Sequence, residues 1–379
     1  MNYRYFKPAD KMVSLLGFGT MRLPVIGGNA AHIDENAAIR MIRHAIDSGV
    51  NYVDTAYMYH GGRSETVTGK ALKDGYRERV LLADKMPVWL AKSSDEMAGI
   101  FDEQLKRLDT DFIDLYLVHN VNKAVWDRAV RFGIVDFLEA KRAEGRIKYI
   151  GFSYHDDAEF FKTVVDAYPW DFCQIQLNYM DARLQAGVEG LKHAGSKGIP
   201  VVVMEPLKGG KLTDAVPDSV LALWDSADIH RTPAEWALRW VADFPEVLTI
   251  LSGMTTYEQV EENIRILSDA APNTLTEKER ELINRASDEY NRLIRASCTG
   301  CRYCLPCPMK LQIPDLLNYY NEWFLYGQNP KVQADFNMFI NPKARPSACS
   351  GCRACEEKCP QQLPISDIMK EMAELFEKK

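Results

Sequence analysis

Eight apolar runs rich in β-branched residues recur along the chain, and segments with the periodicity of amphipathic helices separate them. The alternation predicts β-α units and a parallel sheet, and eight units within about 250 residues are what a (β/α)8 TIM barrel requires. We therefore expect an α/β protein built on this barrel, with a doubly wound open sheet as the competing fold. The runs are GFGTM near Gly17, VNYVDTA near Val50, VLLADKM near Val80, FIDLYLVH near Phe112, IKYIGFS near Ile147, FCQIQLNY near Phe172, IPVVVMEPL near Ile199 and VLTILSG near Val247.

Helix-start signals lie between the runs and after the last one. TPAEWALRWV has Thr232 as an N-cap, Pro233 at the first helical position and Glu235 where a capping box requires it. TLTEKERELINRASDEYNRLIRA predicts a further amphipathic helix, opened by Thr276 and Glu279. PLKGGKLTDAVPDS, between the seventh and eighth runs, instead predicts an enlarged loop at the barrel mouth, where such enzymes place binding residues.

The composition is that of a globular protein with a sizeable core, since 46% of the 379 residues are hydrophobic and the net charge is -7. Acidic and basic residues are mixed without a basic stripe, so we expect no nucleic-acid partner. The segment MNYRYFKPADK has no apolar core, and no later run approaches the roughly 18 apolar residues of a membrane span. We therefore expect a cytoplasmic protein, in which nine cysteines indicate metal binding rather than disulfides.

Polar residues finish several of the apolar runs, and active sites of TIM barrels lie at these carboxyl ends of the strands. The second run ends at Asp54 and leads to Tyr59, the third ends at Lys85 and the fourth at His119. Each residue alone also fits an ordinary structural role. Together they fit carbonyl reduction, because a tyrosine with a pKa of about 10 is a poor proton donor unless a cation such as Lys85 lowers that pKa. A buried lysine needs a carboxylate, for which Asp54 is the candidate, and His119 can orient the carbonyl oxygen.

At these motifs the sequence resembles the aldo-keto reductase family. NYVDTAYMYHGG is similar to the family's Asp-Thr-Ala-x-x-Tyr segment, LLADKMP to its lysine strand and IDLYLVHN to its histidine strand. The resemblance implies an NAD(P)-dependent oxidoreductase that uses NADPH or NADH to reduce small carbonyls or oxidise alcohols by hydride transfer. It implies Tyr59 as general acid, Lys85 and Asp54 as the pair that tunes its pKa, and His119 as the group that orients the substrate.

The resemblance also implies residues that hold the nicotinamide. Ser153 and Gln176 match the residues that hold its carboxamide, although Tyr154 follows the serine where the family usually has asparagine. Met204 stands where many members stack an aromatic ring, and a methionine can still pack on the ring face. The stretch that lines the nicotinamide side is matched by Gly19, Thr20 and Met21.

The last strand and the segment after it, SGMTTYEQVEENI, are similar to the family's adenosine-phosphate segment. NADP-specific members commonly carry an arginine or lysine near the position of Thr255 or Thr256, and this sequence has none there. This argues against a strict preference for NADPH, so NADH is a candidate cofactor as well. The candidate residues are Ser252, Gly253, Met254, Gln259, Glu262 and Asn263.

Eight of the nine cysteines lie in two runs near the end of the chain, SCTGCRYCLPCP and ACSGCRACEEKCP. Both resemble the bacterial ferredoxin pattern, in which three closely spaced cysteines and a fourth before proline bind 4Fe-4S clusters, the fourth ligating the other cluster. The first run departs from this pattern, with two residues instead of three before its fourth cysteine. The resemblance assigns one cluster to Cys298, Cys301, Cys304 and Cys359, and a second to Cys307, Cys349, Cys352 and Cys355.

The two runs continue alike, as CPMKLQIPDLL and CPQQLPISDIM, which indicates an internal duplication. Because IPDLLNYYNEWFLYG reads as a helix, we expect a small α-helical ferredoxin-like domain over residues 297–379, after an aldo-keto reductase barrel over residues 1–296. Zinc is the alternative metal, and a purely structural role of the clusters stays open. For the whole chain the alternatives to a reductase are an electron-transfer adaptor that serves a redox partner protein, and an iron-sulfur redox sensor built on an idle barrel.

Overall fold

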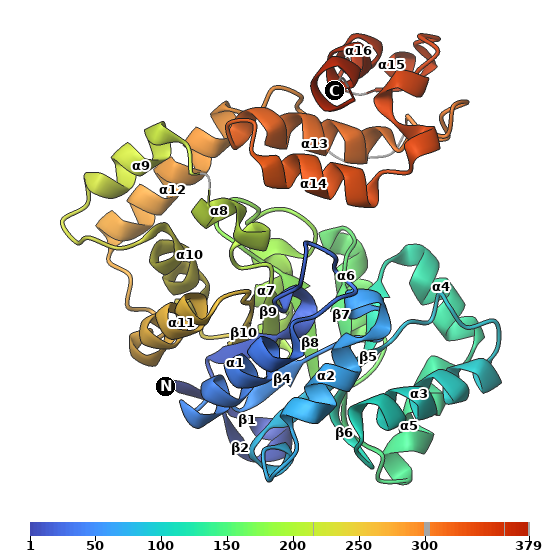
Figure 1. Cartoon of the computed structure of the whole chain (residues 1–379), viewed down its shortest axis with the longest axis vertical. Helices are drawn as coiled ribbons and strands as arrows, with labels where there is room; N and C mark the ends of the chain where they lie inside the picture. Colours follow the sequence, from blue (N-terminus) through green and yellow to red (C-terminus); the bar gives the residue numbers. More distant parts are fainter. Residues whose placement is uncertain (215, 299–303, 360, 378–379) are drawn as a thin grey trace. The chain divides into compact units, whose positions relative to one another are not determined.

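The computed structural model describes residues 1–214, 216–298, 304–359 and 361–377 (Figure 1). The chain divides into two compact units. The first comprises Met1–Gly210 and Ala234–Glu277, and the second comprises Lys211–Pro233 and Lys278–Lys379. Contacts within the chain group residues 211–233 and most of the helix from Glu277 with the segment that carries the C-terminal cysteines. The domain boundary expected after Ala296 stays a prediction. In the described ranges, no helix is both long and apolar enough to cross a membrane.

The first unit contains a closed barrel of eight strands in the order β10-β3-β4-β5-β6-β7-β8-β9, and every neighbouring pair is parallel. Each strand overlaps one of the eight apolar runs, so the predicted (β/α)8 barrel is confirmed and the doubly wound sheet was wrong. The strands are β3 (Leu16–Gly19), β4 (Tyr52–Asp54), β5 (Leu81–Met86), β6 (Ile113–Val121), β7 (Ile147–Tyr154), β8 (Phe172–Gln176), β9 (Val201–Met204) and β10 (Val247–Gly253).

Alternation along each strand divides the side chains between the barrel interior and the layer under the helices. The interior cluster holds Tyr52, Leu81, Ala83, Leu115, Leu117, Phe172, Val202, Leu248 and Leu251, all nearly inaccessible to solvent. The sequence analysis did not anticipate the antiparallel hairpin of β1 (Tyr3–Phe6) and β2 (Lys11–Ser14). Its Phe6 and Val13 join the interior cluster, and the Phe6 ring stacks edge-on against Phe172, so the hairpin closes the amino-terminal end of the barrel.

Amphipathic helices surround the strands, and several begin at a side chain that accepts a hydrogen bond from the first turn. Asp34, Ser93, Asn122 and Asp157 cap α1, α3, α4 and α6 in this way. The helices of this unit are α1 (Glu35–Asp47), α2 (Ser64–Ala71), α3 (Ser94–Leu108), α4 (Lys123–Arg131), α5 (Ile134–Ala143), α6 (Ala158–Asp166), α7 (Gly187–Ser196), α10 (Pro233–Ala242) and α11 (Tyr257–Asp269).

The segment between β9 and α10 differs from the enlarged loop that its Gly, Lys and Pro residues predicted. It contains the short turn η5 (Lys208–Gly210), α8 (Lys211–Asp214) and α9 (Asp218–Asp225). Val220 and Trp224 of α9 are buried, so their apolar area stabilises a helix where the local sequence suggested irregular structure.

The second unit is helical in its described parts, as predicted for the tail. It contains α12 (Glu277–Arg292), α13 (Ile313–Leu325), α14 (Pro330–Phe339), α15 (Ala354–Glu357) and α16 (Ile365–Phe376). Helices α13 and α16 begin at equivalent isoleucines of the two repeated segments, which agrees with the predicted duplication. Cys301 and Pro360 lie outside the described residues.

Candidate active site

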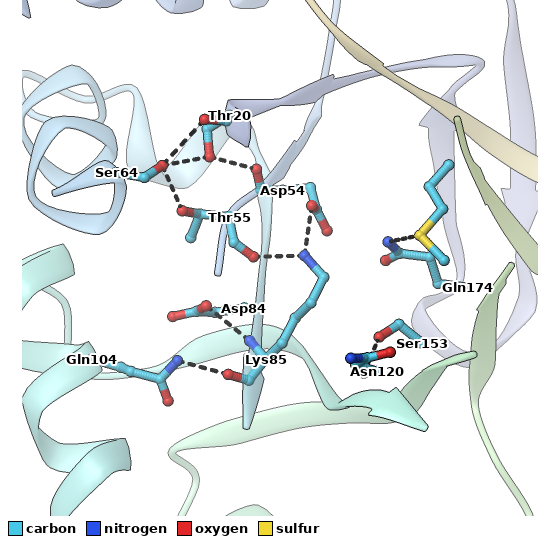
Figure 2. A network of polar contacts seen from close by, with 11 residues as sticks. Thr20, Asp54, Thr55, Ser64, Asp84, Lys85, Gln104, Asn120, Ser153 and Gln174 are labelled. Carbon is cyan, nitrogen blue, oxygen red and sulfur yellow. Dashed lines mark hydrogen bonds and ion pairs between the residues drawn. The ribbon is translucent and has the colours of Figure 1, made fainter. Parts of the chain in front are cut away.

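A buried ion pair lies at the carboxyl end of the barrel strands. The Lys85 ammonium lies 2.6 Å from Asp54 Oδ1 and donates a second hydrogen bond, also 2.6 Å long, to the Thr55 carbonyl (Figure 2). Both side chains are almost fully buried. Strand alternation explains the pairing, because Asp54 follows the inward Tyr52 by two residues and Lys85 follows the inward Ala83 by two.

Tyr59 and His119 lie next to this pair. The Lys85 Nζ is 5.2 Å from the centroid of the Tyr59 ring, and the Tyr59 and His119 rings meet edge-on at 6.3 Å. The Trp89 ring packs against the His119 imidazole, with 5.0 Å between the ring centroids. The four residues of the predicted tetrad are therefore brought together, from β4, the turn after it, β5 and β6.

Burial sets most of the ionisation behaviour of these groups. Burial lowers the pKa of His119 well below its ordinary value, and Lys85 lowers it further, so the imidazole is neutral near pH 7. Burial also disfavours the charge of Lys85, but Asp54 and then Tyr59 outweigh it, so the pKa of Lys85 is raised and the ammonium stays protonated. Burial raises the pKa of Tyr59, and Lys85 opposes that rise. Lys85 acts to lower the pKa of Tyr59, as expected, but burial outweighs this effect and the net change in that pKa is upward.

A second buried polar network fixes the backbone of Lys85 from the helix side of the strand. Asp84 points outward, and its Oδ1 accepts from the Lys85 amide at 2.8 Å, while Gln104 Nε2 donates to the Lys85 carbonyl at 3.0 Å (Figure 2). Asp84 and Glu65 are fully buried and hydrogen-bonded to each other, and Glu65 also pairs with Arg107 at 2.8 Å. Burial, followed by the charge of Glu65, raises the pKa of Asp84 well above its ordinary value, which favours the protonated form of Asp84.

Direct contacts bring together only some of the residues predicted to bind the nicotinamide. Ser153 Oγ accepts from the Asn120 amide at 2.8 Å, and Met204 Sδ accepts from Gln174 Nε2 at 3.4 Å (Figure 2). Gln176 Nε2 donates to Asp181 at 3.1 Å. Tyr154, which replaces the usual asparagine, points away from the interior, and its hydroxyl donates to the Asp157 carbonyl at 2.6 Å.

The candidates around the first strand lie at its carboxyl end. Gly19 ends β3, and Thr20 is buried with its hydroxyl donating to the Asp54 carbonyl at 2.9 Å. Met21 is exposed. An added methyl group on Gly19 would lie 3.3 Å from the Ser252 carbonyl oxygen, so this glycine lets β3 and β10 approach closely.

The candidates on β10 and α11 divide into two groups. Ser252 and Asn263 are buried and hydrogen-bonded to each other at 2.9 Å behind the strand, and Met254 is also buried. Gln259 belongs to the capping box of α11 with Thr256. Gly253 is exposed, and Glu262 is partly exposed. Gly253 and Gln259 are therefore the exposed candidates of this segment.

Several neighbours of the tetrad were missed by the sequence analysis. Trp89 comes four residues after Lys85, and a tryptophan just past a strand end was the available signal. Asp84 is an acid inside an apolar run, which is costly unless it is paired. Asn120 has a left-handed φ of 56° directly after His119, and only the backbone reveals it.

In the second unit, five described cysteines line one pocket: Cys304, Cys307, Cys349, Cys352 and Cys355. Leu311, Ile313, Ile365 and Met369 supply part of its apolar wall. No group of three or more His, Cys, Asp or Glu side chains in the described ranges is close enough to hold a single metal ion. A four-iron cluster separates its ligands over four metal atoms, so sulfur ligands spread around a cavity fit a cluster better than one ion.

A closed barrel of eight parallel strands with titratable side chains at its carboxyl end is the architecture of TIM-barrel enzymes. The model of the Aldo/keto reductase family matches residues 15–287, which is more than half of the chain. The chain belongs to the aldo/keto reductase family and is an oxidoreductase. A second match, described as a 4Fe-4S dicluster domain, covers residues 297–364, so the chain also carries a 4Fe-4S domain.

Curated relatives agree with this assignment. The NADH-specific methylglyoxal reductase of Escherichia coli (strain K12) is 28% identical over 309 residues, which cover 68% of this chain and 91% of that protein. The L-galactose dehydrogenase of Arabidopsis thaliana is 26% identical over 276 residues, covering 68% of this chain and 85% of the relative.

Solved structures show the same similarity. The holo form of an aldo-keto reductase from Bacillus halodurans superposes with a TM-score of 0.63 at 29% identity, covering 76% of this chain and 96% of that one. An aldo/keto reductase from Klebsiella pneumoniae in complex with NADP and acetate gives a TM-score of 0.59 at 27% identity, covering 73% and 93%.

Proposed function

We propose that this oxidoreductase reduces small carbonyl compounds, or oxidises the corresponding alcohols, with NADPH or NADH. The observation that carries the proposal is the buried Lys85–Asp54 ion pair directly beside Tyr59. An ammonium held in a water-poor site stabilises negative charge that develops on a neighbouring phenol oxygen. That is the requirement for a tyrosine that donates its proton to an alkoxide and recovers it later.

The four side chains have separate roles in this proposal. Tyr59 gives its proton to the carbonyl oxygen, and Lys85 lowers the cost of the phenolate that remains. Asp54 keeps Lys85 charged although it is buried. His119 is neutral and can donate a hydrogen bond to the same oxygen without competing as an acid. A bound nicotinamide would supply the hydride.

The residues present fit a nicotinamide dinucleotide. Gly253 is exposed at the end of β10, and Ser153 Oγ, which accepts from a backbone amide, can donate its own proton to a carboxamide. We propose that the remaining candidates make the other contacts with the cofactor. They are Gly19, Thr20, Met21, Gln176, Met204, Ser252, Met254, Gln259, Glu262 and Asn263. The similar proteins do not favour one cofactor over the other. The Escherichia coli relative is named NADH-specific, whereas the Klebsiella pneumoniae structure contains NADP.

We propose two 4Fe-4S clusters in the second unit. The second predicted ligand set, Cys307, Cys349, Cys352 and Cys355, is supported because all four residues line the same pocket, which Cys304 of the first set also lines. The first set, Cys298, Cys301, Cys304 and Cys359, rests on the spacing of the sequence, since Cys301 lies outside the described residues. Bound clusters would supply one-electron redox chemistry, for which a redox partner protein is the proposed electron source.

The test uses anaerobically purified, iron-replete protein with methylglyoxal as the carbonyl and NADH or NADPH as reductant. We expect oxidation of the cofactor that depends on methylglyoxal and that is lost in Tyr59→Phe. Cofactor oxidation that is equal in Tyr59→Phe would contradict the proposed role of this tyrosine. Following cluster absorbance in the same samples, without carbonyl, shows whether reducing equivalents reach the clusters.

A further inference from the structure

A serine near the start of helix α16 faces one of the cysteines of the second predicted ligand set. Ser366 is only 2% exposed, and its Oγ lies 4.0 Å from Cys349 Sγ. A methyl group placed on Gly351 would lie 3.8 Å from the same Oγ. The hydroxyl therefore lies against the segment from Cys349 to Gly351, on the wall of the pocket that the cysteines line.

The backbone of Ser366 is held by residues of the second cysteine run. Its amide donates to Glu356 Oε1 at 2.7 Å, and Glu356 also pairs with Arg353 at 3.3 Å. The Arg353 guanidinium donates in turn to Asp367, the residue after Ser366, at 3.1 Å. These contacts join the start of α16 to α15, which lies beside it (Figure 1). They fix the serine relative to the cysteines of this run.

The direction of the contact between the hydroxyl and the sulfur follows from the chemistry of the ligand. A cysteine that binds a cluster is a thiolate, which has no proton and can only accept a hydrogen bond. The Ser366 hydroxyl must then be the donor. Among the residues that the structure describes, this hydroxyl has no hydrogen-bond partner other than Cys349. A donor that meets a negatively charged acceptor makes a stronger hydrogen bond than a neutral pair does.

The duplication of the tail gives this serine no counterpart. Aligning CPQQLPISDIM with CPMKLQIPDLL puts Pro314 at the position of Ser366, and proline offers neither a hydroxyl nor an amide proton. Ser350, which lines the same pocket, differs in this respect, because Thr299 keeps a hydroxyl at its position in the first run. Ser366 is therefore a donor by which the two repeated segments differ.

We propose that the Ser366 hydroxyl donates a hydrogen bond to the Cys349 thiolate and thereby raises the reduction potential of the cluster that this cysteine binds. Reduction adds one electron to a cluster and breaks no bond to the protein. The added negative charge is shared with the ligand sulfurs, so a donor to one of them stabilises the reduced form more than the oxidised form. The inference rests on the proposed function, because it concerns one of the clusters proposed there.

The test is a redox titration of the full-length, anaerobically purified protein with dithionite as electron donor, in which electron paramagnetic resonance follows the reduced clusters. Ser366→Ala should make one cluster about tenfold harder to reduce, which lowers its midpoint potential by about 59 mV for a one-electron couple, and should leave the other unchanged. Ser366→Gly, which also lacks the hydroxyl, should show the same shift. Ser366→Thr keeps the hydroxyl and should stay near the wild type.

The matched control is Ser347→Ala, because the Ser347 hydroxyl donates to Glu377 and not to a cysteine. Its clusters should keep the wild-type potentials. Equal iron and acid-labile sulfide in all variants separates a change of potential from loss of a cluster.

Wild-type potentials in both Ser366→Ala and Ser366→Gly would overturn the inference, and so would an equal shift in Ser347→Ala. If the wild type holds no iron-sulfur cluster after anaerobic purification, the proposed clusters themselves fail, which is a distinct result.

Discussion

The Lys85 ammonium and the Asp54 carboxylate form an ion pair 2.6 Å long in which the side chains are only 1% and 3% exposed. Such a pair contributes little net stability, because desolvation of both charges offsets their attraction. Removing one partner is different, since it leaves a buried charge without compensation, at a cost of about 3–5 kcal/mol. The ion pair beside Tyr59 is therefore also a sensitive point of the fold.

Lys85→Met should reduce the stability of the barrel by about 3–5 kcal/mol, because Asp54 is left buried and unpaired. The double variant Lys85→Met/Asp54→Asn should be more stable than Lys85→Met alone, although equally inactive. Denaturant unfolding of the wild type, Lys85→Met, Asp54→Asn and the double variant measures both effects. A double variant whose loss equals the sum of two single losses would show that the pair is not coupled.

The pH dependence of stability should report His119. Burial keeps the pKa of this imidazole well below its ordinary value in the folded chain, whereas the unfolded chain takes up a proton below about pH 6.5. Stability is therefore present above that pH and is lost as the pH falls, by up to about 1.4 kcal/mol per pH unit from this residue. The pKa of His155 is also lowered by burial, so it adds a slope of the same sign.

Urea unfolding of wild type and His119→Asn at pH 7.5, 6.0 and 5.0 checks this expectation. The variant should lose less stability between pH 6.5 and 5 than the wild type does, with the slope of His155 remaining. Identical slopes would mean that His119 titrates normally in the folded protein.

Asp84 is predicted to position Lys85 through its backbone. Asp84→Asn keeps an acceptor for the Lys85 amide and a donor toward Glu65, so its kcat and stability should stay near those of the wild type. Asp84→Ala leaves both groups unsatisfied and should cost about 1–3 kcal/mol of stability. Its kcat should fall while KM for the carbonyl is retained, and a normal kcat in Asp84→Ala would contradict the positioning role.

Iron content tests the proposed cluster ligands. Cys355→Ser should lose about half of the iron and acid-labile sulfide of the anaerobically purified protein, because one of two clusters loses a thiolate. Cys173→Ala is the matched control, since Cys173 is buried in strand β8 of the barrel. Equal iron in Cys355→Ser and the wild type, or zinc in place of iron, would argue against the assignment.

Much of the fold could be predicted because local signals and packing agree. Each parallel strand is buried on both faces, so it appears as a continuous apolar run, and the polar residue that ends it marks the active edge. The helices between β9 and α10 were missed because Gly209, Gly210 and Pro217 dominate the local pattern, while the burial of Trp224 is a tertiary effect. The β1–β2 hairpin was missed because its short strands carry little periodicity.

The site was predictable only where its residues end strands. Asp54, Lys85 and His119 could be placed because strand alternation turns them inward. Trp89 could not, because it meets the His119 ring only through the packing of residues that are far apart in sequence. The pairing of Asp84 with Glu65 likewise depends on how α2 packs on β5.

The most direct test of the central claim follows the hydride itself. The protein is incubated anaerobically with methylglyoxal and NADPH or NADH deuterated at the nicotinamide C4, and the product is examined by mass spectrometry. We expect deuterium on the new carbinol carbon with the wild type and none above background with Tyr59→Phe, which should still bind the cofactor. A product that carries no deuterium, or one formed equally by Tyr59→Phe, would contradict direct hydride transfer assisted by Tyr59.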